Sequence, residues 1–80
     1  MVRLFNIAVN GTEISCDYEP EGSNKIGRVT VDTTSYEVKK INFSNYEYGK
    51  NLYVSHVRST LETLLKSGEP LPEETTSVWH

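Results

Sequence analysis

The Asn10-Gly11 pair constrains the fold of this chain more than any other short feature of the sequence. It stands between two strand-forming stretches, "RLFNIAV" before it and "TEISCDY" after it. Asn-Gly is the favoured pair for a two-residue type I′ turn because both central positions need positive φ. The pair therefore predicts a β-hairpin, and the rest of the chain has to be compatible with an antiparallel sheet.

The two strands of this hairpin differ in pattern. In the second, Ile14, Cys16 and Tyr18 alternate with polar residues, which predicts one apolar face. The first is apolar on both faces, with Phe5, Ile7 and Val9 on one and Val2, Leu4 and Ala8 on the other. We therefore expect the first strand to be the more buried and central one. Its second apolar face would be covered by the C-terminal tail or by a second subunit.

Two further strands follow a loop over residues 19–27, which is rich in Pro, Gly, Ser and Asn. "RVTVD" predicts a third strand with Val29 and Val31 inward, and "YEVKKINF" predicts a fourth. The fourth strand changes phase near Lys39-Lys40. Either both of its faces are partly covered, or a bulge resets the register there. A bulge carrying two lysines would suit a protected sheet edge.

From about residue 51 the apolar period becomes helical. The stripe consists of Tyr53, Val57, Leu61, Leu64 and Leu65. Gly68 is a suitable residue to end the helix. The pattern predicts an amphipathic helix over residues 50–67.

The start of the helix has two interpretations. Ser44 and Glu47 have the spacing of a capping box, which would begin the helix at Asn45. Gly49 would then lie inside the helix at a cost of about 1 kcal/mol relative to Ala. We favour a turn over 46–50 and a helix that begins at 50 or 51.

The chain is therefore expected to form one α+β domain over residues 1–80. A four-stranded, mainly antiparallel meander (1–43) would carry one C-terminal helix (50–67) on one face. The Pro-containing tail, 69–80, fits either a short extra strand or a loose arm that docks on a partner. Trp79 near its end favours docking.

Composition excludes several classes of function. The net charge is −3 and the longest basic run is Lys39-Lys40, which argues against nucleic acid as a partner. Cys16 is the sole cysteine, so no disulfide can form within the chain. One Cys and two His do not fill a zinc site, and we expect no metal or cofactor. Without a signal peptide or an apolar run of ~20 residues, a cytoplasmic protein with no membrane association is expected.

Catalytic motifs are missing, and we expect no enzymatic activity. His56 has Ser59 and Thr60 near it on the helix, but no G-x-S-x-G motif occurs. Cys16 falls on an apolar strand face, as a buried structural thiol would. The alternating Asp17, Glu19 and Glu21 lack the spacing of a calcium loop.

An aromatic group is the best candidate for a surface that contacts a partner or a ligand. Its members are Tyr46, Tyr48, Tyr53, His56 and Trp79. The same residues would also complete a small core, and the sequence does not separate the two roles. We expect a small protein-interaction or oligomerising module, either a homodimer or bound to a protein partner. The alternative is a small-ligand-binding protein that uses this aromatic group.

Overall fold

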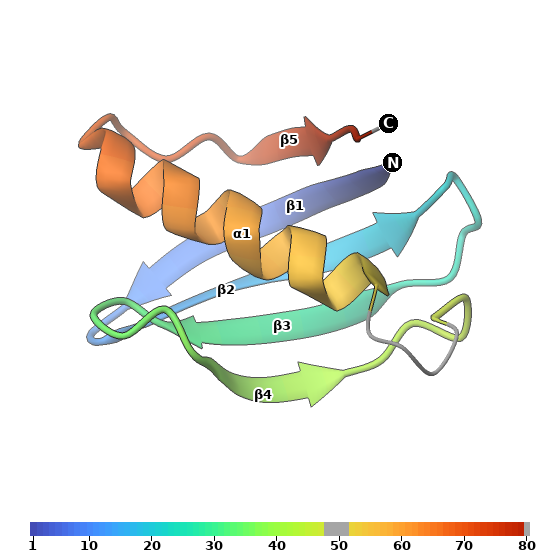
Figure 1. Ribbon diagram of the computed structural model, residues 1–80, viewed down its shortest axis with the longest axis horizontal. Coiled ribbons are helices and arrows are strands. Elements are labelled where there is room, and N and C mark those ends of the chain that lie inside the picture. The colour runs from blue at the N-terminus through green and yellow to red at the C-terminus, as the bar shows by residue number, and fades with distance from the viewer. Residues whose placement is uncertain (48–51, 80) are drawn as a thin grey trace.

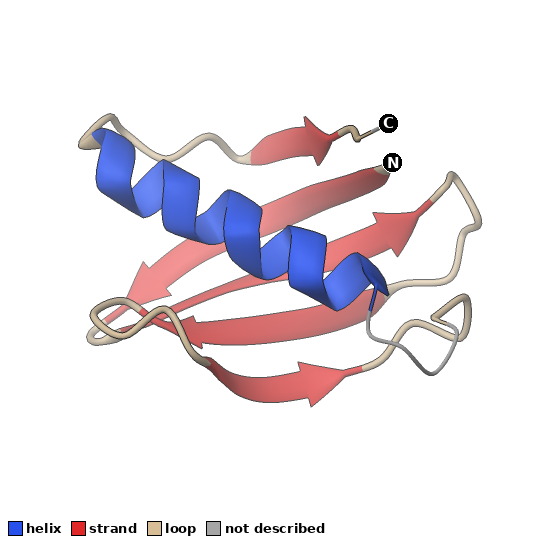
Figure 2. Cartoon of the chain, viewed as in Figure 1, coloured by secondary structure: helices blue, strands red, loops and turns tan. Residues whose placement is uncertain are grey.

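The computed structural model describes residues 1–47 and 52–79. Its elements are β1 (Val2–Asn10), β2 (Glu13–Pro20), β3 (Gly27–Asp32), β4 (Val38–Asn42), α1 (Leu52–Ser67) and β5 (Glu74–Ser77). The strands form one antiparallel sheet in the order β4-β3-β2-β1-β5, and α1 lies across one face (Figures 1 and 2). The α+β prediction is confirmed. The sheet has five strands because the tail adds β5 beside β1.

The predicted hairpin joins β1 to β2, but its turn closes one residue later than expected. Asn10 pairs with Glu13, so the central residues are Gly11 and Thr12. Gly11 has a φ of 64°, whereas Asn10 and Thr12 do not have positive φ. A glycine at the first central position meets the requirement of a type II′ turn. The prediction of a type I′ turn centred on Asn10-Gly11 is therefore wrong.

A β-bulge in β1 explains why this strand is apolar on both sides. The register against β2 shifts between Phe5 and Ala8, and Asn6 there has a φ of 54°. The extra residue exchanges the two faces. Val2 and Leu4, before the bulge, are fully buried in the core. The prediction that they need cover from the tail or from a second subunit is wrong, because they lie on the helix side of the sheet.

The central strand is β2, with β3 and β1 on its two sides. Its residues Ile14, Cys16 and Tyr18 are fully buried, as their alternation predicts. The second half of β1 is exposed instead. The expectation that the first strand is the more buried one is therefore wrong, because the residues of β1 after the bulge are exposed except for half-buried Ile7.

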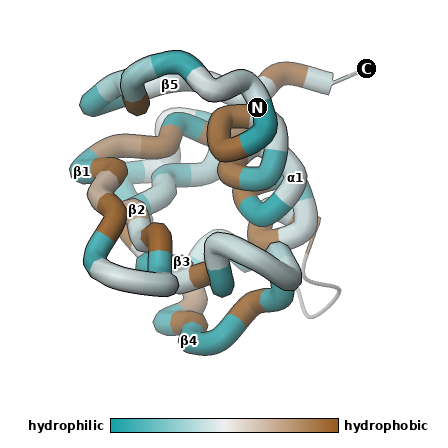
Figure 3. The backbone as a smooth tube through the Cα atoms, turned by 90° about the vertical axis from the view of Figure 1, so that its left-hand side faces the viewer, coloured by the Kyte–Doolittle hydropathy of each residue, from teal (hydrophilic) through white to brown (hydrophobic). Residues whose placement is uncertain are grey.

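The core lies between the sheet and α1, which form two layers (Figure 3). From the helix it takes Tyr53, Val57 and Leu61 of the predicted stripe, and Val54 in addition. Leu64 and Leu65 of that stripe are half-buried at the margin of the core. The buried apolar residues of the core are Val2, Leu4, Ile14, Cys16, Tyr18, Val29, Val31, Tyr53, Val54, Val57 and Leu61.

Of the two interpretations of the fourth strand, the bulge near Lys39-Lys40 is the one that the structure shows. Lys40 pairs with Thr30 while Val38 pairs with Val31, so Lys39 is the extra residue. The Nζ atom of Lys39 lies 3.2 Å from a carboxylate oxygen of Glu13. β4 is one edge of the sheet. A bulge and a lysine on an edge strand hinder pairing with another strand.

The helix does not begin at Asn45, because residues 44–47 form a turn in which the Glu47 amide donates to the Ser44 carbonyl (3.0 Å). The described helix begins at Leu52, and the predicted start at residue 50 lies outside the described residues. Gly68 follows the last helical residue with a φ of 70°, which confirms its predicted role.

Candidate functional site

The start of α1 is attached to the sheet by a polar network around Tyr18. The Tyr18 ring is buried, and its hydroxyl donates to Glu47 (3.0 Å) and accepts from the Ser44 amide (3.0 Å). The other Glu47 oxygen accepts from the Tyr53 amide (2.9 Å), which satisfies a donor in the first helical turn. Burial raises the pKa of Tyr18 to about 12, so its hydroxyl stays a donor. The network fixes where Tyr53 lies relative to the sheet.

The tail returns to this helix start through stacked and tilted aromatic rings. The centroids of Tyr46 and Tyr53 are 5.9 Å apart, and those of Tyr53 and Trp79 are 5.8 Å apart. The rings of His56 and Trp79 are stacked at 3.7 Å with an angle of 7°. Four residues of the predicted aromatic group thus lie together, whereas Tyr48 lies outside the described residues.

These rings contact one another and the core. Tyr53 is buried, and Tyr46, His56 and Trp79 are half-buried. The contacts hold the end of the tail against α1, so Trp79 docks on its own chain, and docking of the tail on a partner stays a prediction. The role of the group as a surface for a partner or ligand stays a prediction.

A shallow groove of about 320 Å³ runs between α1 and β5 beside this aromatic group. On one side of the groove, the lining residues recur at helical spacing along α1. On the other side, they belong to β5 and to the residue that follows it. The lining residues are His56, Ser59, Thr60, Thr63, Thr76, Ser77 and Val78. None of them carries a fixed charge, although a quarter of the chain is charged. The groove therefore offers hydroxyl and backbone groups to an occupant.

The sequence indicated only His56 of this groove as part of a candidate surface; Ser59 and Thr60 were noted solely as hydroxyl groups near it on the helix. Thr63 continues the same helical row, and that spacing was a signal available in the sequence. Thr76 and Ser77 could not be placed, because their position depends on which strand the tail joins.

The ring of His56 takes part in the packing of the tail against α1. In the described part of the chain it stacks on Trp79 and forms no hydrogen bond to a serine or a carboxylate. The hydroxyl of Thr60 donates instead to the His56 carbonyl (2.8 Å). Such back-bonding to the helix is a local structural role.

The other polar residues considered from the sequence lie apart from the groove. Cys16 is fully buried, and burial raises the pKa of its thiol to about 12, which makes it a poor nucleophile. Asp17 pairs with Arg28 (2.9 Å) and Glu19 with Arg3 (3.2 Å). Across residues 1–47 and 52–79, no cluster of three or more His, Cys, Asp or Glu side chains could hold a metal ion.

Comparison with family models, with curated proteins and with solved structures gave no match. Among the described residues, no helix has the length and apolar character needed to cross a membrane. What this chain does is therefore inferred from its own residues.

Proposed function

We propose that this chain is a protein-interaction module that binds an extended segment of a partner protein along β5. The observation that carries the proposal is that β5 is an edge strand next to an uncharged groove on α1. An edge strand presents unpaired N–H and C=O groups on its outer side, and an extended segment can add to it as a further strand.

The two edges of the sheet differ in a way that favours β5 as the binding edge. β4 carries a bulge and two lysines, which hinder the addition of a strand. The pairing of β5 with β1 runs in regular register from Glu74 to Ser77, and β5 contains neither lysine nor proline. A segment added to β5 would place alternate side chains toward Ser59 and Thr63 of the helix.

The carboxylates near β5 indicate which kind of partner segment would bind there. Glu73 and Glu74 lie at the start of β5, and Glu69 lies close before them in the chain. Arg3 pairs with Glu74, whereas no cation lies within ion-pair distance of Glu69 or Glu73 in the described chain. A segment with a basic residue near this end would gain favourable interactions and a faster association rate.

The aromatic group has an indirect role in this proposal. Trp79 stacks on His56 and contacts Tyr53, so it holds the strand that the partner would pair with. A small-ligand site has less support, because Tyr46, Tyr53, His56 and Trp79 pack against one another.

The test is selection of peptides from a displayed random library on the purified chain, followed by NMR titration with a selected peptide. The proposal expects amide shifts in β5 and the facing side of α1. Ser59→Arg, inside the groove, should weaken binding tenfold or more. Ser55→Arg is the matched control, because Ser55 is an exposed serine on the same helix outside the groove lining.

Three results would contradict the proposal. The first is a selected peptide whose binding survives Ser59→Arg, and the second is a library that yields no peptide specific for this chain. The third is a dimer, seen by light scattering over a hundredfold concentration range, that Ser59→Arg dissociates. The occupant of β5 would then be a second copy of this chain rather than a partner segment.

A further inference from the structure

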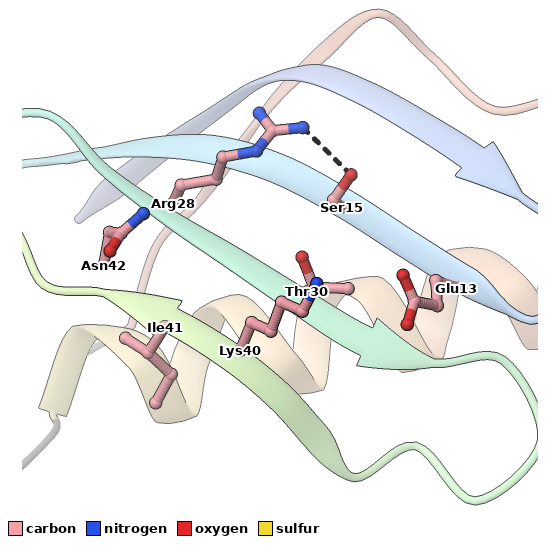
Figure 4. Close-up of a pocket in the computed structure, with 7 residues that line it drawn as sticks. All are labelled: Glu13, Ser15, Arg28, Thr30, Lys40, Ile41 and Asn42. Carbon is pink, nitrogen blue, oxygen red and sulfur yellow. Dashed lines mark hydrogen bonds between the residues drawn. The ribbon is translucent and has the colours of Figure 1, made fainter.

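The face of the sheet opposite α1 carries a polar trough over β2, β3 and β4. Its volume is about 560 Å³. Figure 4 shows the side chains that line it. Its hydrogen-bond donors come from three neighbouring strands, and they are Ser15, Arg28, Thr30, Lys40 and Asn42. The proposed binding of a partner segment leaves this trough unused, because it concerns β5 and the helix side.

Strand register brings these donors together. Thr30 is the direct cross-strand partner of both Ser15 and Lys40, and Arg28 is the partner of Asn42 in the adjacent row. Side chains directly opposite on one face have Cβ atoms about 5 Å apart. The donors therefore surround one volume above β3, and they come from positions far apart in the sequence.

The carboxylates near the trough are already bound to other groups. Asp17 accepts from Arg28 (2.9 Å) and from Asn6 (2.8 Å). Glu13, at the end of the trough, pairs with Lys39 (3.2 Å). Within the described chain, no carboxylate lies within ion-pair distance of Lys40.

The hydroxyl groups are available as donors. The Ser15 oxygen accepts from Arg28 (3.1 Å), which leaves the Ser15 proton free to point into the trough. The Thr30 hydroxyl belongs to a residue that is 9% exposed, and it lies between Ser15 and Lys40. An anion placed there would meet one ammonium group and at least two hydroxyl donors.

We propose that this trough binds the phosphate group of a small molecule, with Lys40 as its main charged contact. Phosphate suits the site because its oxygens are arranged tetrahedrally and can accept from donors on three strands at once. A planar carboxylate has two oxygens and meets fewer of them. The guanidinium of Arg28, held by Asp17 and Ser15, supplies a second positive group at the rim.

The experiment is an NMR titration of the chain with inorganic phosphate at low ionic strength, where charge contacts are least screened. Acetate and chloride at matched ionic strength are the comparison anions. The expected result is saturable shifts of the Ser15, Thr30 and Lys40 amides, with a dissociation constant of about 1 mM. Lys40→Gln should weaken binding at least tenfold, and Thr30→Val should weaken it several-fold.

Lys25→Gln is the matched control. Lys25 is an exposed lysine in the 21–26 loop with no ion pair among the described residues, so its loss should leave phosphate affinity within twofold. Three results would overturn the proposal: shifts that do not saturate, shifts of equal affinity with acetate, or unchanged affinity in Lys40→Gln. A folded spectrum of each variant shows that the trough was present when tested.

Discussion

The hydroxyl group of Tyr18 joins the central strand to the 44–47 turn and, through Glu47, to the first turn of α1. Tyr18→Phe keeps the ring and removes this connection. The Ser44 amide, whose residue is 2% exposed, would then lose its acceptor in a buried place. We expect the free energy of unfolding to fall by ~1–3 kcal/mol, measured by urea denaturation.

Tyr36→Phe is the control for this change. Tyr36 is half-buried and its ring lies under the Lys66 ammonium at 5.1 Å, a contact that does not need the hydroxyl. Its loss should change stability by less than ~0.5 kcal/mol. Equal effects of the two substitutions would mean that the Tyr18 network does not stabilise the fold.

The buried thiol of Cys16 should make the free energy of unfolding depend on pH in the alkaline range. Burial raises its pKa from 9.0 to about 12, so the folded chain keeps a thiol proton that the unfolded chain loses above pH 9. The unfolded state then binds fewer protons, and the free energy of unfolding falls as pH rises from 9 toward 12. Burial raises the pKa of Tyr18 in the same direction, from 10.0 to about 12.

Denaturation at several pH values from 7 to 11 measures this decline. In Cys16→Ala the part of the decline that begins near pH 9 should disappear, while the part due to Tyr18 should remain above pH 10. An identical pH profile in the variant would show that the thiol does not contribute to the decline.

At the level of elements, β5 depends on Trp79. Each aromatic contact is worth ~0.5–1.5 kcal/mol beyond the area that it buries, and Trp79 makes two, with Tyr53 and His56. Trp79→Ala should therefore raise hydrogen exchange of those β5 amides that face β1 at least tenfold and leave β3 protected. Phe43→Ala, at an aromatic side chain that is 51% exposed, should leave β5 unchanged.

The elements also show what the sequence could predict. The hairpin, the helix and the end of the helix at Gly68 could be predicted because each has a signal within a few residues of the sequence. The bulge in β4 was indicated by the change of face of the apolar residues along the strand. The bulge at Asn6 could not be inferred from the sequence. A strand with apolar residues at both odd and even positions can contain a bulge, but it can equally be buried on both faces. The turn lies at Gly11-Thr12 and not at Asn10-Gly11, because a type II′ turn needs a glycine only at its first central position.

The candidate surfaces were less predictable for a related reason. The sequence indicated an aromatic group that includes Tyr53, His56 and Trp79, and these three side chains do lie together. Which strand the tail would join was not encoded in any local pattern. The trough on the opposite face depends on the register of three strands. The sequence therefore could not predict that Ser15 and Lys40 lie on the two sides of Thr30.

At the level of the whole molecule, the core is small enough that one side chain can decide whether the chain folds. Leu61 is fully buried on α1 against the sheet. Leu61→Ala should cost ~2–5 kcal/mol. A domain of this size has a total stability of about 4–12 kcal/mol. Thermal unfolding should therefore shift down by roughly 10 °C or more.

Leu52→Ala is the comparison on the same helix, because Leu52 is 48% exposed. It should shift thermal unfolding only slightly. If Leu52→Ala lowered the unfolding temperature as much as Leu61→Ala, the exposed side of α1 would have to be covered in solution. A mass measurement on the same sample would show such an association directly.

The pairing of β1 with β5 has a consequence for how the chain is made. Val2 is aligned with Ser77, so β1 obtains its outer neighbour only after β2, β3, β4 and α1 have been synthesised. A nascent chain can form the β1–β4 sheet earlier, but its apolar face has no helix and β1 is still an open edge. The outer side of β1 therefore stays unpaired until β5 is in place, and it is the last position of the sheet to be filled.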